Sequence, residues 1–216
     1  VDVTTVGTYT LTYNVTDANG NVAVEVTRTV NVVDTTLPVI TLSGESTVTI
    51  EVDSTYTDAG ATATDNYDTG LTSSIVTVST VDATTVGVYT LTYNVTDANG
   101  NVAVEVTRTV NVVDTTVPFI TLLGDATATI EVGSIYTDAG ATASDNYDGD
   151  ITLSIVTVNP VDATTVGVYT LTYNVTDTNG NVAVEVTRTV NVLDTTVPVI
   201  TLLGDATATI EVGSIY

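Results

Sequence analysis

Residues 81–118 read VDATTVGVYTLTYNVTDANGNVAVEVTRTVNVVDTTVP, and almost the same string returns at residues 161–198. A third, slightly altered copy occupies residues 1–38, so equivalent positions lie 80 residues apart, as 81 and 161 do. An interval of this length is too long for one solenoid turn or one propeller blade, but it suits a small β-sandwich domain. The repeat therefore predicts a tandem array of such domains.

The expected domain boundaries fall at a recurring Asp-Thr-Thr-x-Pro element, which starts at Asp34, Asp114 and Asp194. Cutting the chain at this element leaves two whole repeats between two partial ones. The expected pieces are the C-terminal part of an Ig-like repeat at 1–33, whole repeats at 34–113 and 114–193, and the N-terminal part of a repeat at 194–216. We therefore expect the chain to be a window from a longer array.

The composition predicts an all-β chain. Thr and Val dominate it, and β-branched residues favour strands over helices. Asn99-Gly100 is the strongest hairpin signal, because both central residues of the turn that it favours take positive φ. The stretch 79–87 fits either another strand or a loop. In the repeat 34–113, the strands of the antiparallel sandwich are expected at 39–42, 47–52, 61–64, 75–78, 88–96 and 102–112.

One arginine interrupts the last of these strands. Valines alternate from Val102 to Val112, yet Arg108 falls on the same parity as the valines. Either a bulge shifts the register, or the guanidinium lies at the edge of the sandwich with its stem packed inside. We interpret Arg108 as a structural residue that pairs with a nearby carboxylate, such as Glu51 or Glu105.

The amino-acid composition excludes most catalytic chemistry, because several reactive residue types are absent. The chain has 26 acids, three cations (Arg28, Arg108 and Arg188), a net charge of -23, and no His, Cys, Met, Trp or Lys. It therefore has no Ser-His-Asp or Cys-His system, no Schiff base and no zinc site built from nitrogen or sulfur ligands. The negative charge disfavours nucleic acid, and no apolar run reaches the ~18 residues that cross a bilayer. Carboxylates, amides and hydroxyls remain, which are the ligands of hard cations.

Several strings together resemble a known group of domains: DTTLPVITL, TIEV, YTDAGATATDNYD, TVGVYTLTYNVTD and TRTVNV. They look like bacterial immunoglobulin-like (Ig-like) repeats of the hyaline-repeat type, which occur in tandem in large secreted surface proteins and adhesins. The resemblance implies an Ig-like sandwich at the bacterial cell surface or outside the cell. Gly87–Tyr89 also resembles the tyrosine corner of Ig-type domains, with Tyr9 and Tyr169 as its equivalents.

The Ig-like arrangement that this resemblance implies gathers acids at one end of each repeat. The N-terminal segment and two loops meet there, and carboxylates packed together repel one another unless a cation lies among them. We therefore predict calcium at this end, in a layout that resembles the cadherins, with solvated turns as the alternative. The predicted ligands are Asp34, Asp65, Asp68 and Asp97 in one repeat and Asp114, Asp145, Asp148, Asp150 and Asp177 in the next.

Two details refine this prediction. Asp150 gives the later repeat one more acid, so that repeat should bind calcium more tightly. Asp53, Asp58 and Asp82 are expected at the opposite end of their repeat, where they could form part of a bridging site with the next repeat. We regard this bridging site as the weaker hypothesis.

Near-identical repetition favours a structural function over a specific active site. The first hypothesis is a stalk in an adhesin or surface filament, with neighbouring repeats and possible self-association as its contacts. The alternative is a multivalent module that binds a glycan or a protein through exposed tyrosines such as Tyr56, Tyr67, Tyr136 and Tyr147. An enzyme is not expected, because acids on turn tips offer no substrate cleft.

Overall fold

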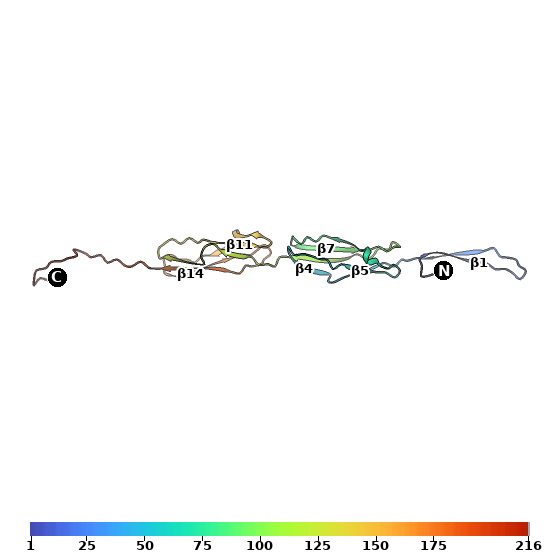
Figure 1. Cartoon of the computed structure of the whole chain (residues 1–216), viewed down its shortest axis with the longest axis horizontal. Helices are drawn as coiled ribbons and strands as arrows, with labels where there is room; N and C mark the ends of the chain where they lie inside the picture. Colours follow the sequence, from blue (N-terminus) through green and yellow to red (C-terminus); the bar gives the residue numbers. More distant parts are fainter. Residues whose placement is uncertain (216) are drawn as a thin grey trace. The chain divides into compact units, whose positions relative to one another are not determined.

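The computed structural model describes residues 1–215, which divide into two compact units, one ending at Asp114 and the other beginning at Thr115. As predicted, the chain is all-β: the described residues form strands and two short 3₁₀ turns, but no α-helix. Figure 1 shows β4, β5 and β7 in the first whole repeat, and β11 and β14 in the second. No helix within residues 1–215 has the length and apolar character needed to span a membrane.

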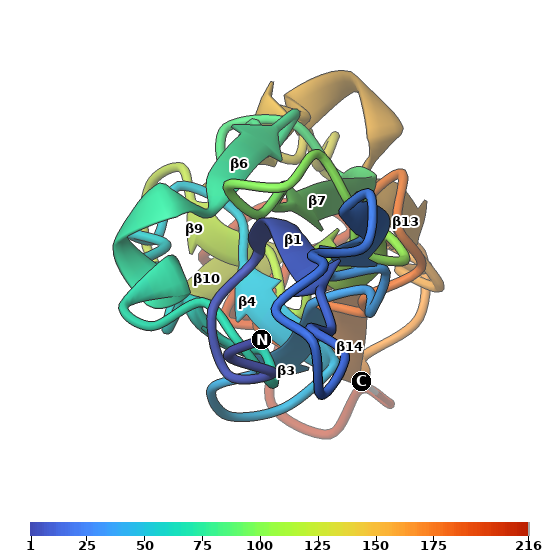
Figure 2. The same cartoon turned by 90° about the vertical axis from the view of Figure 1, so that its right-hand side faces the viewer.

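The larger sheet of the first whole repeat has the strand order β4-β8-β7-β6. β7 is antiparallel to both β8 and β6, and Figure 2 shows β6 beside β7. β4 runs parallel to β8, from Thr47 opposite Thr109 to Glu51 opposite Val113. The sandwich is thus antiparallel except at this pair. The bounds are β4 (Thr47–Glu51), β6 (Val76–Ser79), β7 (Gly87–Asn94) and β8 (Val106–Val113).

The smaller sheet pairs β3 (Val39–Leu42) with β5 (Ala61–Thr64), and these two strands have the bounds that their apolar pattern predicts. More buried residues alternate with less buried ones along β3, β5, β7 and β8, as half-buried strands require, whereas β6 is exposed along its length. The buried apolar side chains include Ile40 and Ala63 from the smaller sheet, and Leu91, Tyr93, Val110 and Val112 from the larger one.

The second unit repeats this topology with one short strand added to the smaller sheet, and its sheets have the orders β10-β15-β14-β13 and β12-β11-β9. In the first 33 residues, β1 and β2 form a hairpin whose register matches that of β7 with β8. The bounds are β1 (Gly7–Tyr13), β2 (Val26–Val32), β9 (Phe119–Leu122), β10 (Thr127–Glu131), β11 (Ala141–Asp145), β12 (Gly149–Asp150), β13 (Val156–Val158), β14 (Gly167–Asn174) and β15 (Val186–Leu193).

The β7–β8 hairpin differs in detail from the sequence prediction. Gly100 takes φ 90°, but Asn99 is not among the residues with positive φ. The amide of Asp97 donates to the carbonyl of Asn101 at 3.0 Å, which closes a three-residue loop with glycine at its left-handed position. The prediction of two positive φ angles was therefore wrong, although the hairpin itself is present.

The last strand of the repeat begins later than expected, and its start explains why Arg108 shares the parity of the valines. β8 starts at Val106, and Val102 is joined to Thr96 only by an isolated bridge. Val102 and Val104 are exposed whereas Ala103 is buried, so the alternation changes phase before β8 begins. The break thus turns these two valines outward and leaves Arg108 facing the core. The stretch after β6 is a loop up to Gly87.

A tyrosine fastens the loop that leads into β7. The Tyr89 hydroxyl donates to the carbonyl of Thr85 at 2.8 Å, and Tyr9 and Tyr169 make the same bond four residues upstream. A Cβ on Gly87 would come within 3.4 Å of the Tyr89 ring, so the ring packs directly against this glycine. This is the hydrogen bond of a tyrosine corner.

Candidate metal centre

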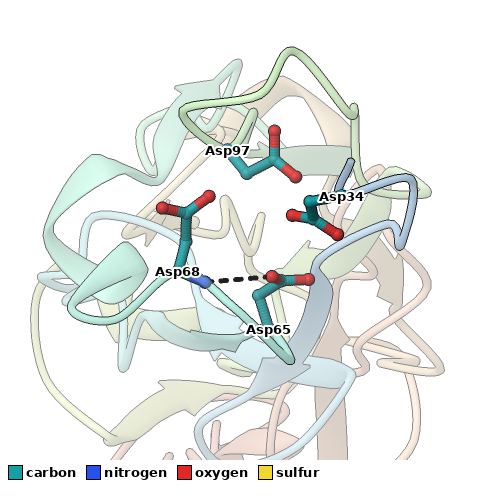
Figure 3. Close-up of side chains that lie close together, drawn as sticks. All are labelled: Asp34, Asp65, Asp68 and Asp97. Atoms are coloured by element: carbon teal, nitrogen blue, oxygen red, sulfur yellow. Dashed lines mark hydrogen bonds between the residues drawn. The ribbon is translucent and has the colours of Figure 1, made fainter. Parts of the chain in front are cut away.

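Four carboxylates converge at one end of the repeat 34–113 (Figure 3). Asp34 precedes the segment that leads to β3, Asp65 follows β5, Asp68 lies in the next loop, and Asp97 lies between β7 and β8. One oxygen of each carboxylate lies within 4.8 Å of one oxygen of every other. Asp97 is buried and the other three are half-buried. The fold therefore brings three separate parts of the chain together through acidic side chains.

Two of these aspartates also hold their own loops in shape. Oδ1 of Asp97 accepts the backbone amides of Asn99 at 2.9 Å and Asn101 at 2.7 Å. Oδ2 of Asp65 accepts the amide of Asp68 at 3.1 Å, the bond drawn dashed in Figure 3. Oδ2 of Asp65 also accepts the amide of Tyr67 at 2.9 Å, which lowers the pKa of the Asp65 carboxyl. Both carboxylates are therefore fixed in place by the backbone.

Neutral donors link the three parts of the chain. The amide of Ala98 donates to Oδ2 of Asp68 at 3.1 Å, and Nδ2 of Asn99 donates to Oδ2 of Asp34 at 3.2 Å. These bonds tie the β7–β8 loop to both other segments. They bring no positive charge to the group.

The arginines of the two whole repeats lie in the sandwich cores. Arg108 is 1% exposed and forms an ion pair with Asp58, whose side chain is 24% exposed. Its Nε donates to the carbonyl of Glu45 at 2.9 Å, and Nη2 donates to the carbonyls of Ser43 and Gly60. The expected partners, Glu51 and Glu105, were therefore wrong, as was the edge position. The actual partner lies 50 residues away in sequence and becomes a neighbour only on folding.

Arg188 repeats this arrangement with every N–H donor used. It pairs with Asp138 and donates to the Tyr173 hydroxyl at 3.1 Å. Its remaining donors go to the carbonyls of Leu123, Asp125 and Gly140. Within residues 1–215, the ion pairs are those of Arg108 and Arg188, and Arg28 lies 6.0 Å from the ring centroid of Tyr13. The group around Asp97 thus has no arginine in it.

The arginine networks also involve residues that were assigned to the bridging metal site and to the tyrosine binding module. Asp58 pairs with Arg108 and accepts the Tyr93 hydroxyl at 2.7 Å, so it serves the core rather than an acidic end of the repeat. Tyr56 and Tyr136 are half-buried, and their hydroxyls contact Asp58 and Asp138. These two tyrosines are consequently not exposed binding platforms.

The second whole repeat arranges its acids differently. Asp145 and Asp177 each place an oxygen within 4.8 Å of the other, and Oδ2 of Asp145 is a buried atom without a hydrogen-bond partner. Burial raises the pKa of Asp177, but the donors of Asn181 and its neighbours outweigh burial and lower it overall. Asp114, the equivalent of Asp34, is buried and is the last residue of the first unit.

Two further predicted ligands of this repeat are held elsewhere. The hydroxyl of Thr178 donates to Oδ1 of Asp148 at 2.7 Å, and its amide donates to Oδ2, also at 2.7 Å. Thr178 stands where the first repeat has Ala98. Asp150 is exposed and accepts the amide of Thr152 at 3.0 Å. The geometry thus places neither Asp148 nor Asp150 in the converging group, so the extra acid does not enlarge it.

The donor set of the first repeat fits a calcium ion. Calcium takes 6–8 oxygen ligands at 2.3–2.6 Å, so opposite ligands lie roughly 5 Å apart. The oxygens of Asp34, Asp65, Asp68 and Asp97 lie within 4.8 Å of one another, close enough to share one ion of this size. Magnesium demands shorter bonds of about 2.0–2.1 Å and a near-ideal octahedron, and it usually keeps several water ligands.

A further residue was not singled out from the sequence. Glu131 ends β10, and its carboxylate accepts the amides of Thr195 at 2.9 Å and Thr196 at 3.2 Å. It also accepts their hydroxyls, at 2.7 Å and 2.8 Å. The hydrogen bonds from Thr195 and Thr196 lower the pKa of Glu131 to about 2. In the sequence, Ile-Glu-Val and Asp-Thr-Thr each recur at a fixed position of the 80-residue repeat, and this repetition was the available signal for the contact between them.

Comparison with known proteins supports the architecture. Bacterial surface protein Ig-like domains match residues 1–32, 40–112 and 120–192. Hyalin from Lytechinus variegatus is 36% identical over 99% of the chain, and hyalin from Strongylocentrotus purpuratus is 40% identical over 98%. The chain spans 42% and 18% of the lengths of these two relatives.

Among solved structures, a lipoprotein from Bacteroides thetaiotaomicron shares 32% identity, with a TM-score of 0.34, over 38% of this chain and 40% of its own. The matches to the bacterial surface domains account for far more than half of the residues and recur in three tandem segments. The chain therefore belongs to the family of bacterial surface protein Ig-like domains.

Proposed function

We propose that these repeats form the stalk or spacer of an extracellular bacterial adhesin or surface filament, and that calcium at the acidic ends of the domains stiffens it. The observation that carries the proposal is the convergence of Asp34, Asp65, Asp68 and Asp97 without a side-chain cation. In a chain with a net charge of -23, whose two core arginines are already paired, an external cation is the natural counter-charge.

A bound calcium ion would restrict the segment through which the chain enters the repeat. Asp34 begins the segment that enters the repeat, whereas Asp65 and Asp97 belong to loops after β5 and β7. When bound, calcium supplies a multivalent charge that neutralises carboxylate repulsion. The four aspartates would then hold the entering segment against both loops and restrict its motion. A restricted entry segment stiffens the chain at the start of the repeat.

Repetition supports a structural role over a specific binding site. The two whole repeats share their topology and their buried arginine networks, so each added copy adds length with the same internal support. Neighbouring repeats of the same chain are the expected contacts. Lateral or end-to-end assembly into a filament belongs to the same proposal.

Thermal unfolding of the full chain in excess EDTA and then in millimolar calcium tests the calcium part. A ligand that binds only the folded state stabilises it by about 2.7 kcal/mol at a hundredfold excess over Kd. We expect the melting temperature to rise by several degrees, with magnesium much less effective. An unchanged melting temperature would leave the acids as solvated turn residues and the array as a plain spacer.

A further inference from the structure

The path of the chain through the second whole repeat determines how a pulling force loads it. The chain enters through β9, continues into β10 and leaves through β15. β10 and β15 are parallel neighbours, paired from Thr127 opposite Thr189 to Glu131 opposite Leu193. In a parallel pair, the start of one strand and the end of the other lie at opposite ends. Tension on the chain therefore slides β10 against β15 and loads all five residue pairs together.

Arg188 fastens the end of this pair where the force enters. It lies on β15, and its guanidinium binds the carbonyls of Leu123 and Asp125, which connect β9 to β10. If β9 peels away from β11, the detachment reaches this connection and meets charge-assisted bonds inside the core. Asp138 and Tyr173 hold the guanidinium in place, and Arg188 is only 2% exposed.

Glu131 fastens the opposite end, where the force leaves. It is the last residue of β10, and its carboxylate binds the amides and hydroxyls of Thr195 and Thr196, just after β15. The amide of Val132 also donates to the carbonyl of Leu193 at 2.7 Å. The pairing is thus prolonged past the strand ends. A pull on the outgoing segment must break these bonds before it reaches β15.

We propose that Arg188 and Glu131 are the two fasteners of a load-bearing clamp formed by β10 and β15, which keeps the domain folded under tension. This inference rests on the proposed stalk function and names the part of each domain that carries force. It does not depend on calcium. In the first whole repeat, Arg108 of β8 binds the carbonyls of Ser43 and Glu45 in the same way.

Single-molecule pulling on the full chain, held at its two ends in EDTA, tests the clamp. The variant is Glu131→Ala, because this half-buried carboxylate can be removed without opening the core. We expect one of the two domain-unfolding events to become faster at a given force, on the order of tenfold, while the other keeps the wild-type rate. The unaltered repeat serves as a reference within the same molecule.

Asp162→Ala is the matched control. Asp162 accepts the amide of Thr164 at 2.9 Å and the hydroxyls of Thr164 and Thr165, so it makes bonds of the same kind within its own turn. It does not bridge the two loaded strands. We expect Asp162→Ala to lower thermal stability without changing the unfolding rate under force. Equal effects of the two variants, or no effect of Glu131→Ala, would overturn the clamp.

Arg188→Lys tests the other fastener. Lysine retains a charge for Asp138 but cannot reach both carbonyls with the planar fork of arginine. We expect faster unfolding under force in one domain event, and an unchanged rate in a folded variant would overturn this half of the proposal. Because every trace is recorded in EDTA, these results stand apart from the calcium test. Repeating the pull in calcium then tests the proposed stiffening separately.

Discussion

Carboxylates have different partners in two regions of the same repeat, a cationic side chain in the core and only neutral donors at the end. Inside the sandwich, Asp58 faces the guanidinium of Arg108, which the chain itself supplies. At the end of the repeat, the carboxylate of Asp97 converges with three others that have only neutral donors around them. The contrast separates acids that hold the core from acids that remain available to an external ion. Net charge alone could not make that distinction.

The largest expected effect comes from the core side of the comparison. Asp138→Ala leaves Arg188 buried without its counter-charge, and breaking such a pair costs about 3–5 kcal/mol. We therefore expect urea unfolding of the full chain to show one strongly destabilised domain. The matched change at the other kind of site, Asp145→Asn, should alter stability little in EDTA. Similar losses for both variants would remove the distinction between the two groups.

Alkaline titration probes the same core network. Burial, and then Asp58, raises the pKa of Tyr93 to about 12. In the unfolded chain this phenol ionises near pH 10, so folding favours its neutral form. Its contribution to stability is therefore complete below pH 10 and is lost as the pH rises towards 12.

Unfolding monitored by circular dichroism between pH 8 and pH 12 measures this loss. Tyr93→Phe should flatten the decline for the first domain, because phenylalanine has no proton to lose. A decline that is identical in Tyr93→Phe would show that other groups govern alkaline stability.

Asp65→Asn isolates the end of the repeat. The amide oxygen can still accept from Tyr67 and Asp68, so the loop keeps its shape while one negative charge disappears. In EDTA we expect an unchanged or slightly raised melting temperature, because carboxylate repulsion falls. In calcium, the first domain should lose most of the stabilisation, about 2.7 kcal/mol at a hundredfold excess over Kd. A full calcium response in this variant would contradict the assignment.

The smallest expected effect comes from exchanging one residue between the repeats. Thr178 binds both oxygens of Asp148, whereas Ala98 leaves only its amide to Asp68. Thr178→Ala should free Oδ1 of Asp148 and strengthen calcium binding in the second repeat, by about tenfold or 1.4 kcal/mol. Ala98→Thr should weaken binding in the first repeat. Calcium-dependent melting of the two variants would show opposite shifts, and shifts in the same direction would refute this reading.

Local patterns predicted the fold well, because strand pairing in a small sandwich follows alternation and turn residues. The strands at 39–42 and 61–64 have their expected bounds, and the hairpin at Gly100 is present. A register shift in the last strand was one of two predicted alternatives, but its place was not predicted, since Val102 and Val104 look like core residues until Ala103 takes the inward position. The 80-residue repeat predicted a tandem array of sandwich domains, which local strand propensity alone would not have indicated.

Long-range partners were harder to predict. Arg108 pairs with Asp58, 50 residues earlier in the sequence, rather than with Glu51 or Glu105, and a pairing over this distance forms only when the chain folds. Thr178 adds a hydroxyl hydrogen bond to Asp148 where the first repeat has Ala98, a difference that the acidic pattern alone did not indicate. The Ig-like layout did indicate which loops gather Asp34, Asp65, Asp68 and Asp97. It could not say which acids would be taken up by hydrogen bonds of their own.

Calorimetric titration of the full chain with calcium shows directly whether the converging aspartates bind the ion. We expect saturable binding of calcium, much weaker binding of magnesium, and the loss of one calcium site in Asp65→Asn. The absence of saturable binding up to millimolar calcium, or an unchanged number of sites in Asp65→Asn, would contradict the proposed calcium site.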